Sequence, residues 1–174
     1  MESRSIYDLP VAGFGSGLHH FTYQIDQEFF GLFPSSPLEK GQFEVFVEVD
    51  KRHDGLTVMI EAHGYMDTNC DRCLAGIRLP LEATQTFLYR YSTRDEKDDE
   101  IFFIPPQTPV INVADHIYES IGLAIPIIKK YACEEEAVPP CNRDVLKMIK
   151  KQKVPPVTNN SVWEVLKNVQ YDKN

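Results

Sequence analysis

The sequence lacks both a surplus of positive charge and a long apolar run. Its 18 Lys and Arg residues stand against 26 Asp and Glu, which gives a formal net charge of −8. The most apolar segment, residues 121–128, is interrupted by Gly122 and Pro126 and falls far short of the roughly 20 residues of a membrane helix. The N-terminus lacks the apolar core of a signal peptide. These features argue against a general polyanion binder and a membrane protein, and they predict a cytoplasmic protein.

The chain also lacks the sequence motifs of common enzyme classes. It contains no nucleophile elbow, no phosphate-binding glycine loop and no two-histidine metalloprotease motif. The glycine-rich segment 13–17 neither follows a clear strand nor opens a helix, so we interpret it as a turn. Without an export signal, the four cysteines are expected to be thiols or metal ligands rather than disulfides. We therefore expect no enzymatic activity.

Alternating apolar and polar residues are present in most of the first two-thirds of the chain, and this period of two predicts strands. The predicted strands cover residues 21–25, 43–49, 56–62, 79–91 and 101–104. Asp54-Gly55 between the second and third is a strong hairpin signal. Sequential strands joined by short turns predict an antiparallel meander, or a partial barrel.

One convincing helix is predicted over residues 113–125, with Asn112 as its cap and Asp115 in its first turn. Its apolar stripe is expected to pack on the sheet, and Pro126 is expected to end it. The fold class is therefore α+β, with a single domain over residues 1–150. Residues 151–174 are interpreted as a linker containing Pro155-Pro156, followed by a short amphipathic C-terminal helix from Ser161.

The most specific local motif is Cys70-Asp71-Arg72-Cys73, which falls between two predicted strands and so at a hairpin tip. Two cysteines separated by two residues can bind one zinc ion from a tight loop. Cys133 and Cys141 are the candidates for the two remaining ligands of a structural zinc site, and unligated thiols are the alternative. Thiol–disulfide exchange is disfavoured, because no helix is predicted to follow Cys70.

Two charged segments are candidates for partner binding. Residues 92–100 contain five acidic side chains, Asp95, Glu96, Asp98, Asp99 and Glu100. They are interpreted as a solvated loop, with recruitment of a basic partner as the alternative. A short helix is predicted over 141–148, and a basic cluster overlaps it and extends beyond it. The lysines of that cluster, the candidate RNA-binding residues, are Lys147, Lys150, Lys151 and Lys153.

In their order and spacing, these pieces resemble the YceD-like family of bacterial and plastid proteins. The resemblance rests on Cys70-Asp71-Arg72-Cys73-Leu74 between strands, on the acidic insertion, and on the helix that ends in Leu123-Ala124-Ile125-Pro126-Ile127. It also includes Cys133, the terminal Trp163-Glu164-Val165-Leu166, and the N-terminal segments Gly17-Leu18-His19-His20-Phe21 and Phe29-Phe30.

The resemblance implies a non-catalytic role in accumulation of large-subunit ribosomal RNA, and hence in ribosome biogenesis. The partner expected from it is a ribosomal RNA precursor or a large-subunit ribosomal protein. Two mechanisms remain open. The lysine cluster could contact RNA, or the acidic surface could act as a chaperone-like binder of a basic ribosomal protein. No small-molecule substrate is evident, and a thiol redox enzyme is the disfavoured third alternative.

Overall fold

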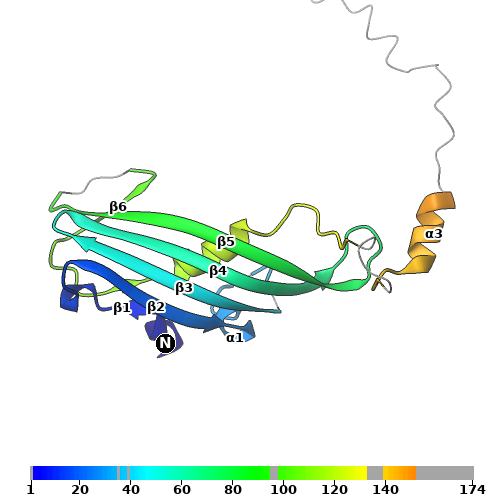
Figure 1. Ribbon diagram of the computed structural model, residues 1–174, viewed down its shortest axis with the longest axis horizontal. Helices are drawn as coiled ribbons and strands as arrows, with labels where there is room; N and C mark the ends of the chain where they lie inside the picture. Colours follow the sequence, from blue (N-terminus) through cyan, green and yellow to red (C-terminus); the bar gives the residue numbers. More distant parts are fainter. Residues whose placement is uncertain (1, 35, 39, 95–97, 133–138, 152–174) are drawn as a thin grey trace, which may run out of the picture.

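A five-stranded sheet dominates the computed structural model, which describes residues 2–34, 36–38, 40–94, 98–132 and 139–151 (Figure 1). Its strands stand side by side in the order β2-β3-β4-β5-β6. Their bounds are β2 Gly17–Ile25, β3 Gly41–Arg52, β4 Gly55–Asn69, β5 Gly76–Tyr91 and β6 Ile101–Ile104. Every strand predicted from alternation is present, within an open sheet rather than a closed barrel, and the α+β fold class is confirmed.

The β3–β4 hairpin turns at His53 and Asp54, with Arg52 opposite Gly55. Gly55 is required there because β5 passes very close to it: a Cβ atom at this position would lie 2.0 Å from the carbonyl oxygen of Tyr89. The Asp-Gly signal in the sequence therefore marks both the turn and the close approach of a third strand.

The pairing of β6 differs from the prediction of a wholly antiparallel meander. The first three pairings are antiparallel, but β6 runs parallel to the end of β5, with Leu88 opposite Ile101 and Tyr91 opposite Ile104. A tight two-residue turn would impose an antiparallel pairing, whereas nine residues, 92–100, separate the end of β5 from the start of β6.

One face of the sheet carries the core. Val45, Val49 and Val58 are each 0% exposed, and they point to this face because side chains alternate along a strand. Helix α2 (Ala114–Leu123) covers this face through Ile117 and Ile121, and Figure 1 shows it behind β4 and β5. The predicted packing of the main helix is therefore correct.

The ends of α2 differ slightly from the predicted helix. The N-cap position is Val113 rather than the predicted Asn112, because the helix begins at Ala114. Asn112 still supports the first turn, since its Oδ1 accepts from the Ala114 N–H at 3.0 Å. The helix ends at Leu123, ahead of Pro126. Leu123 is 67% exposed and does not extend the buried stripe.

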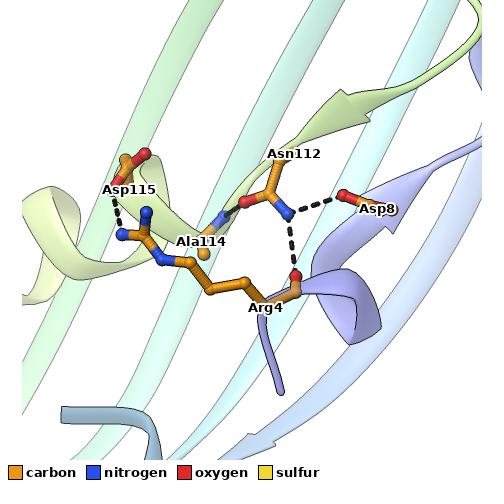
Figure 2. Close-up of polar contacts among 5 residues, drawn as sticks. All are labelled: Arg4, Asp8, Asn112, Ala114 and Asp115. Atoms are coloured by element: carbon orange, nitrogen blue, oxygen red, sulfur yellow. Dashed lines mark hydrogen bonds and ion pairs between the residues drawn. The ribbon is translucent and has the colours of Figure 1, made fainter. Parts of the chain in front are cut away.

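The N-terminal segment packs against the start of α2 (Figure 2). It contains the 3₁₀ turns η1 (Glu2–Tyr7) and η2 (Val11–Gly13) and the short strand β1 (Asp8–Leu9), which pairs with β7 (Ile111–Asn112). The Asn112 side-chain amide donates to the carbonyl of Arg4 and to Oδ1 of Asp8, and Arg4 forms an ion pair with Asp115. A short helix α1 (Gln27–Phe30) adds Phe29 and Phe30 to the core.

Beyond α2, the remaining described element is α3 (Arg143–Lys151), at the far end of the β4–β5 hairpin (Figure 1). The predicted linker and the C-terminal helix from Ser161 lie outside the described residues. Among the helices that the structure describes, none combines the length and apolar character needed to span a bilayer.

Candidate functional site

The CxxC motif forms the tip of the β4–β5 hairpin, as predicted. The Cys70 N–H donates to the Ala75 carbonyl, and the Leu74 N–H donates to the Cys70 carbonyl, both at 2.8 Å. Leu74 has a φ of 58°, in the left-handed region that tight turns of this kind need. This tight turn over residues 70–75, called the knuckle below, is the hairpin tip that the sequence predicts for a zinc site.

Both cysteines of the motif are free thiols, each only 1% exposed. Together with Ile77 they form a small cluster, separate from the main core, against which Tyr131, Cys141 and Leu146 pack. Burial raises the pKa of the Cys70 thiol, but backbone hydrogen bonds from Tyr131, Arg72 and Cys73 outweigh it and leave the pKa below its ordinary value. These hydrogen bonds stabilise a thiolate, the form that binds a metal.

A pair of reciprocal hydrogen bonds fixes the tip to the segment that follows α2. The Asp71 N–H donates to the Lys129 carbonyl at 2.8 Å, and the Lys129 N–H donates to Oδ2 of Asp71 at 2.6 Å. The sequence predicts a cysteine cluster between the hairpin tip and the segment after α2. These two hydrogen bonds hold the hairpin tip and that segment together.

The described residues include three of the four predicted zinc ligands. Cys141 is half-buried beside Cys70 and Cys73, whereas Cys133 lies outside the described residues. Cys141 is disulfide-bonded, which differs from the expectation that every cysteine is a thiol or a metal ligand. Within the described ranges, no group of three or more His, Cys, Asp or Glu side chains is arranged to hold a metal ion, so the zinc site stays a prediction.

Helix α3 carries the predicted basic cluster and docks on the cysteines. Asn142 caps it, accepting from the N–H groups of Asp144 at 3.2 Å and Val145 at 3.3 Å. Leu146 packs on the cysteine cluster, while Met148 is 66% exposed. The helix runs from Arg143 to Lys151, later than the predicted 141–148, because its cap is Asn142.

The candidate RNA-binding lysines are only partly placed by the structure. Lys147 and Lys151 are exposed on α3, and Lys147 forms an ion pair with Asp144 at 3.3 Å. Lys150 belongs to α3, and Lys153 lies outside the described residues. In the acidic connection, Asp98, Asp99 and Glu100 are exposed, whereas Asp95 and Glu96 lie outside the described residues.

Two open hollows of the described surface lie beside each other along β4 and β5, and the second reaches Ile77 next to the cysteines. They have volumes of about 730 and 770 Å³ and share Lys40, Asp67 and Arg78. Asp67 is already in an ion pair with Arg78 at 3.1 Å. Neither hollow is lined by a cysteine, serine or histidine.

A comparison with protein families covers the elements just described. The family model described as "Large ribosomal RNA subunit accumulation protein YceD" matches residues 58–170, which is more than half of the 174 residues. The chain belongs to the YceD family. The match begins in β4 and includes the cysteine tip, α2 and α3. No curated protein matches, and neither does any solved structure. The YceD family name associates the chain with accumulation of large-subunit ribosomal RNA.

Proposed function

We propose that this YceD-family chain is a non-catalytic factor in biogenesis of the large ribosomal subunit, and that it supports accumulation or processing of its RNA in the cytoplasm. The observation that carries the proposal is the family match over residues 58–170, which takes in both the cysteine tip and the basic helix. The family name specifies the RNA and leaves the mechanism open, so the mechanism has to follow from the residues.

A non-catalytic role is supported by the burial of the CxxC pair. Cys70 and Cys73 are each 1% exposed, and a thiol that exchanges disulfides must be reached by another sulfur. Cys70 also stands between two strands rather than at a helix N-terminus, so it lacks the helix dipole that activates redox thiols. The lowered pKa of Cys70 favours the thiolate, and the burial of that thiolate suits a metal ligand better than a nucleophile.

We further propose that α3 and the lysines after it contact ribosomal RNA. The exposed Lys147 and Lys151 stand on a helix anchored through Leu146, so their positions are tied to the domain. In a chain of net charge −8, a concentrated basic helix is what RNA phosphates would require. The proposed RNA-binding residues are Lys147, Lys150, Lys151 and Lys153.

A binding experiment tests this interaction with a matched control. The variant Lys147→Gln/Lys151→Gln should bind single-stranded ribosomal RNA fragments more weakly. Its log–log salt slope should be flatter by about 1.4, because each lysine–phosphate pair accounts for about 0.7 of the slope. The control Lys40→Gln/Arg94→Gln removes the same charge from exposed positions outside α3 and should leave the slope unchanged. Equal effects of both variants would contradict a specific interaction with α3.

A cellular experiment tests the role itself. Deletion of the gene should lower large-subunit ribosomal RNA relative to small-subunit RNA and should reduce free and assembled large subunits in gradient profiles. Re-expression of the control variant should restore them. Normal RNA levels and profiles in the deletion strain would refute the assembly role, whatever the binding data show.

We also propose that a structural zinc ion binds Cys70 and Cys73, with Cys133 and Cys141 completing its ligands under reducing conditions. The knuckle backbone, the two buried thiols and the lowered pKa of Cys70 suit half of a four-thiolate site. Such an ion would join the hairpin tip to the start of α3.

Under reduction, purified protein should contain about one zinc per chain and lose thermal stability with a chelator. Cys70→Ser should abolish both properties, and metal-free protein that melts at an unchanged temperature would exclude the site.

A further inference from the structure

The sheet has a second face, opposite the core, on which no helix of the described chain packs. On this face the outward positions of β2, β3, β4 and β5 lie next to one another in a fixed register. Figure 1 shows α2 on the far side of β4 and β5. Three neighbouring rows cross the middle of the open face: His20-Glu48-Met59-Thr86, Thr22-Phe46-Glu61-Thr84 and Gln24-Glu44-His63-Glu82. We call these positions the glutamate face.

The glutamate face has a charge of one sign. Its three rows contain the four glutamates Glu44, Glu48, Glu61 and Glu82, and they contain no lysine or arginine. Glu44 accepts a hydrogen bond from the Gln24 amide at 3.0 Å. His20 Nδ1 lies 3.4 Å from Oε2 of Glu48.

Arginines on the same side of the sheet stand only beyond these rows, and each is already paired. Arg52 and Arg90, at one end, form ion pairs with Asp50 at 2.7 Å and Asp54 at 3.3 Å. Arg78, at the other end, pairs with Asp67 at 3.1 Å. The central glutamates therefore keep their negative field.

Apolar side chains are exposed in the middle of this acidic field. Phe46 is 41% exposed although it stands at the centre of the sheet. Beside it is a hollow of about 190 Å³, whose lining includes Phe46, Met59, Glu48 and Glu61. An apolar floor with carboxylates at its rim matches the shape of a lysine or arginine side chain, which has an apolar stem and a cationic head.

Like charges gathered on one face work against folding, because neighbouring carboxylates repel each other across strands. A sheet face that only had to remain soluble would be more stable with both signs interspersed. The arrangement is therefore better explained by a ligand that brings the opposite charge. RNA would be repelled here, since its phosphates carry the same sign as the glutamates.

We propose that the glutamate face binds a Lys- or Arg-rich segment of a partner protein. One cationic side chain places its stem over Phe46 and Met59 and its head between Glu48 and Glu61, where charge-assisted hydrogen bonds form. This surface goes beyond the proposed function and does not depend on it. It is also distinct from the acidic connection 92–100.

The test measures binding of a labelled synthetic peptide, rich in lysine and arginine, to the full chain by fluorescence anisotropy. The variant Glu48→Gln/Glu61→Gln should weaken binding about tenfold and flatten its salt dependence, since two exposed charge pairs are together worth about a factor of ten. The matched control Asp98→Asn/Asp99→Asn removes the same charge from the acidic connection and should change affinity less than about twofold. Phe46→Ser, at an exposed ring, should also weaken binding but keep the salt dependence.

Further arms make each outcome decisive. Thermal unfolding of Glu48→Gln/Glu61→Gln should be unchanged or shifted upward, because repulsion is relieved; a loss of stability together with loss of binding would overturn the proposal. Equal effects of the two double variants would show attraction by net charge alone. Tighter binding of RNA than of the peptide, if it is abolished by Phe46→Ser, would assign the face to RNA. Self-association abolished by Glu48→Gln/Glu61→Gln would assign it to a second copy of the chain. Equal effects of the two double variants, assignment to RNA and assignment to a second copy would each overturn the proposal.

Discussion

Leu74 has a backbone conformation that side chains with a Cβ atom rarely adopt. Its φ of 58° carries a strain of about 1–2 kcal/mol, which glycine would avoid. Its side chain is 69% exposed and contributes little packing. Leu74→Gly should therefore raise the free energy of unfolding by about 0.5–1 kcal/mol, after the extra unfolded-state entropy of glycine is subtracted.

Denaturant unfolding measures this effect, and Leu123→Gly is its matched control. Leu123 is equally exposed, at 67%, but it belongs to α2. There glycine should lower the free energy of unfolding by about 0.5–1 kcal/mol. A loss of stability in both variants would mean that the left-handed position is not strained.

His116 makes folding sensitive to pH. Its ring stacks on Phe87, and its Nε2 and the Tyr89 hydroxyl share a hydrogen bond. Burial lowers the pKa of His116, and Glu119 and Asp115 offset this only in part. Over a range of pH below about 6.5, the His116 imidazole therefore stays neutral in the native state but is protonated in the unfolded chain. The free energy of unfolding should keep its full value above pH 6.5, which is about the pKa of histidine in the unfolded chain. At lower pH it should decrease, by at most about 1.4 kcal/mol per pH unit.

Unfolding free energies measured at pH 7.5 and at lower pH check this behaviour. In His116→Gln the difference between the two pH values should shrink, because the titrating group is gone. In His53→Gln, which changes an exposed turn residue, the difference should match that of the original chain. An unchanged pH dependence in His116→Gln would contradict the assignment.

At the scale of elements, Asn112 connects the N-terminal segment to the main helix. Its side chain bonds to Arg4, Asp8 and Ala114 over distances of 2.6 to 3.0 Å. Asn112→Ala should lower the free energy of unfolding by about 2 kcal/mol, because three hydrogen bonds, one of them to the first N–H of α2, are removed together. Hydrogen exchange should also quicken at the Val113 N–H, which donates to the Tyr7 carbonyl.

The matched variant Asp115→Asn removes only the ion pair with Arg4, between side chains that are 46% and 68% exposed. It should change the free energy of unfolding by less than about 1 kcal/mol. If the two variants are equally destabilised, Asn112 is not the main connection.

The elements that the sequence predicted are those set by local alternation. Residues 43–49 and 56–62 alternate apart from Phe46 and Met59, and the Asp-Gly turn fixes their register, so β3 and β4 could be predicted. The parallel orientation of β6 and the pairing of β1 with β7 could not, because both depend on contacts between distant segments. The cysteine tip was predictable from its two flanking strands. The glutamate face was not, since it appears only when four strands are aligned.

At the scale of the whole molecule, charge is separated along the long dimension of the sheet. Glu61 lies at the centre of the glutamate face, and β4 runs on from it to the cysteine tip where α3 docks. From Glu61 to Asn69 the strand spans about 26 Å at about 3.3 Å per residue. Partners bound at the two proposed surfaces would therefore not overlap.

Surfaces at this separation should act independently, since substitutions more than about 7–10 Å apart usually add. The combined variant Glu48→Gln/Glu61→Gln/Lys147→Gln/Lys151→Gln should lose peptide affinity and RNA affinity by the same factors as its parent double variants. Glu48→Gln/Glu61→Gln alone should bind RNA slightly more tightly at low salt, because part of the long-range repulsion is removed. Titration of RNA into the peptide complex measures both effects. Displacement of the peptide by RNA would show instead that the two ligands compete for one surface.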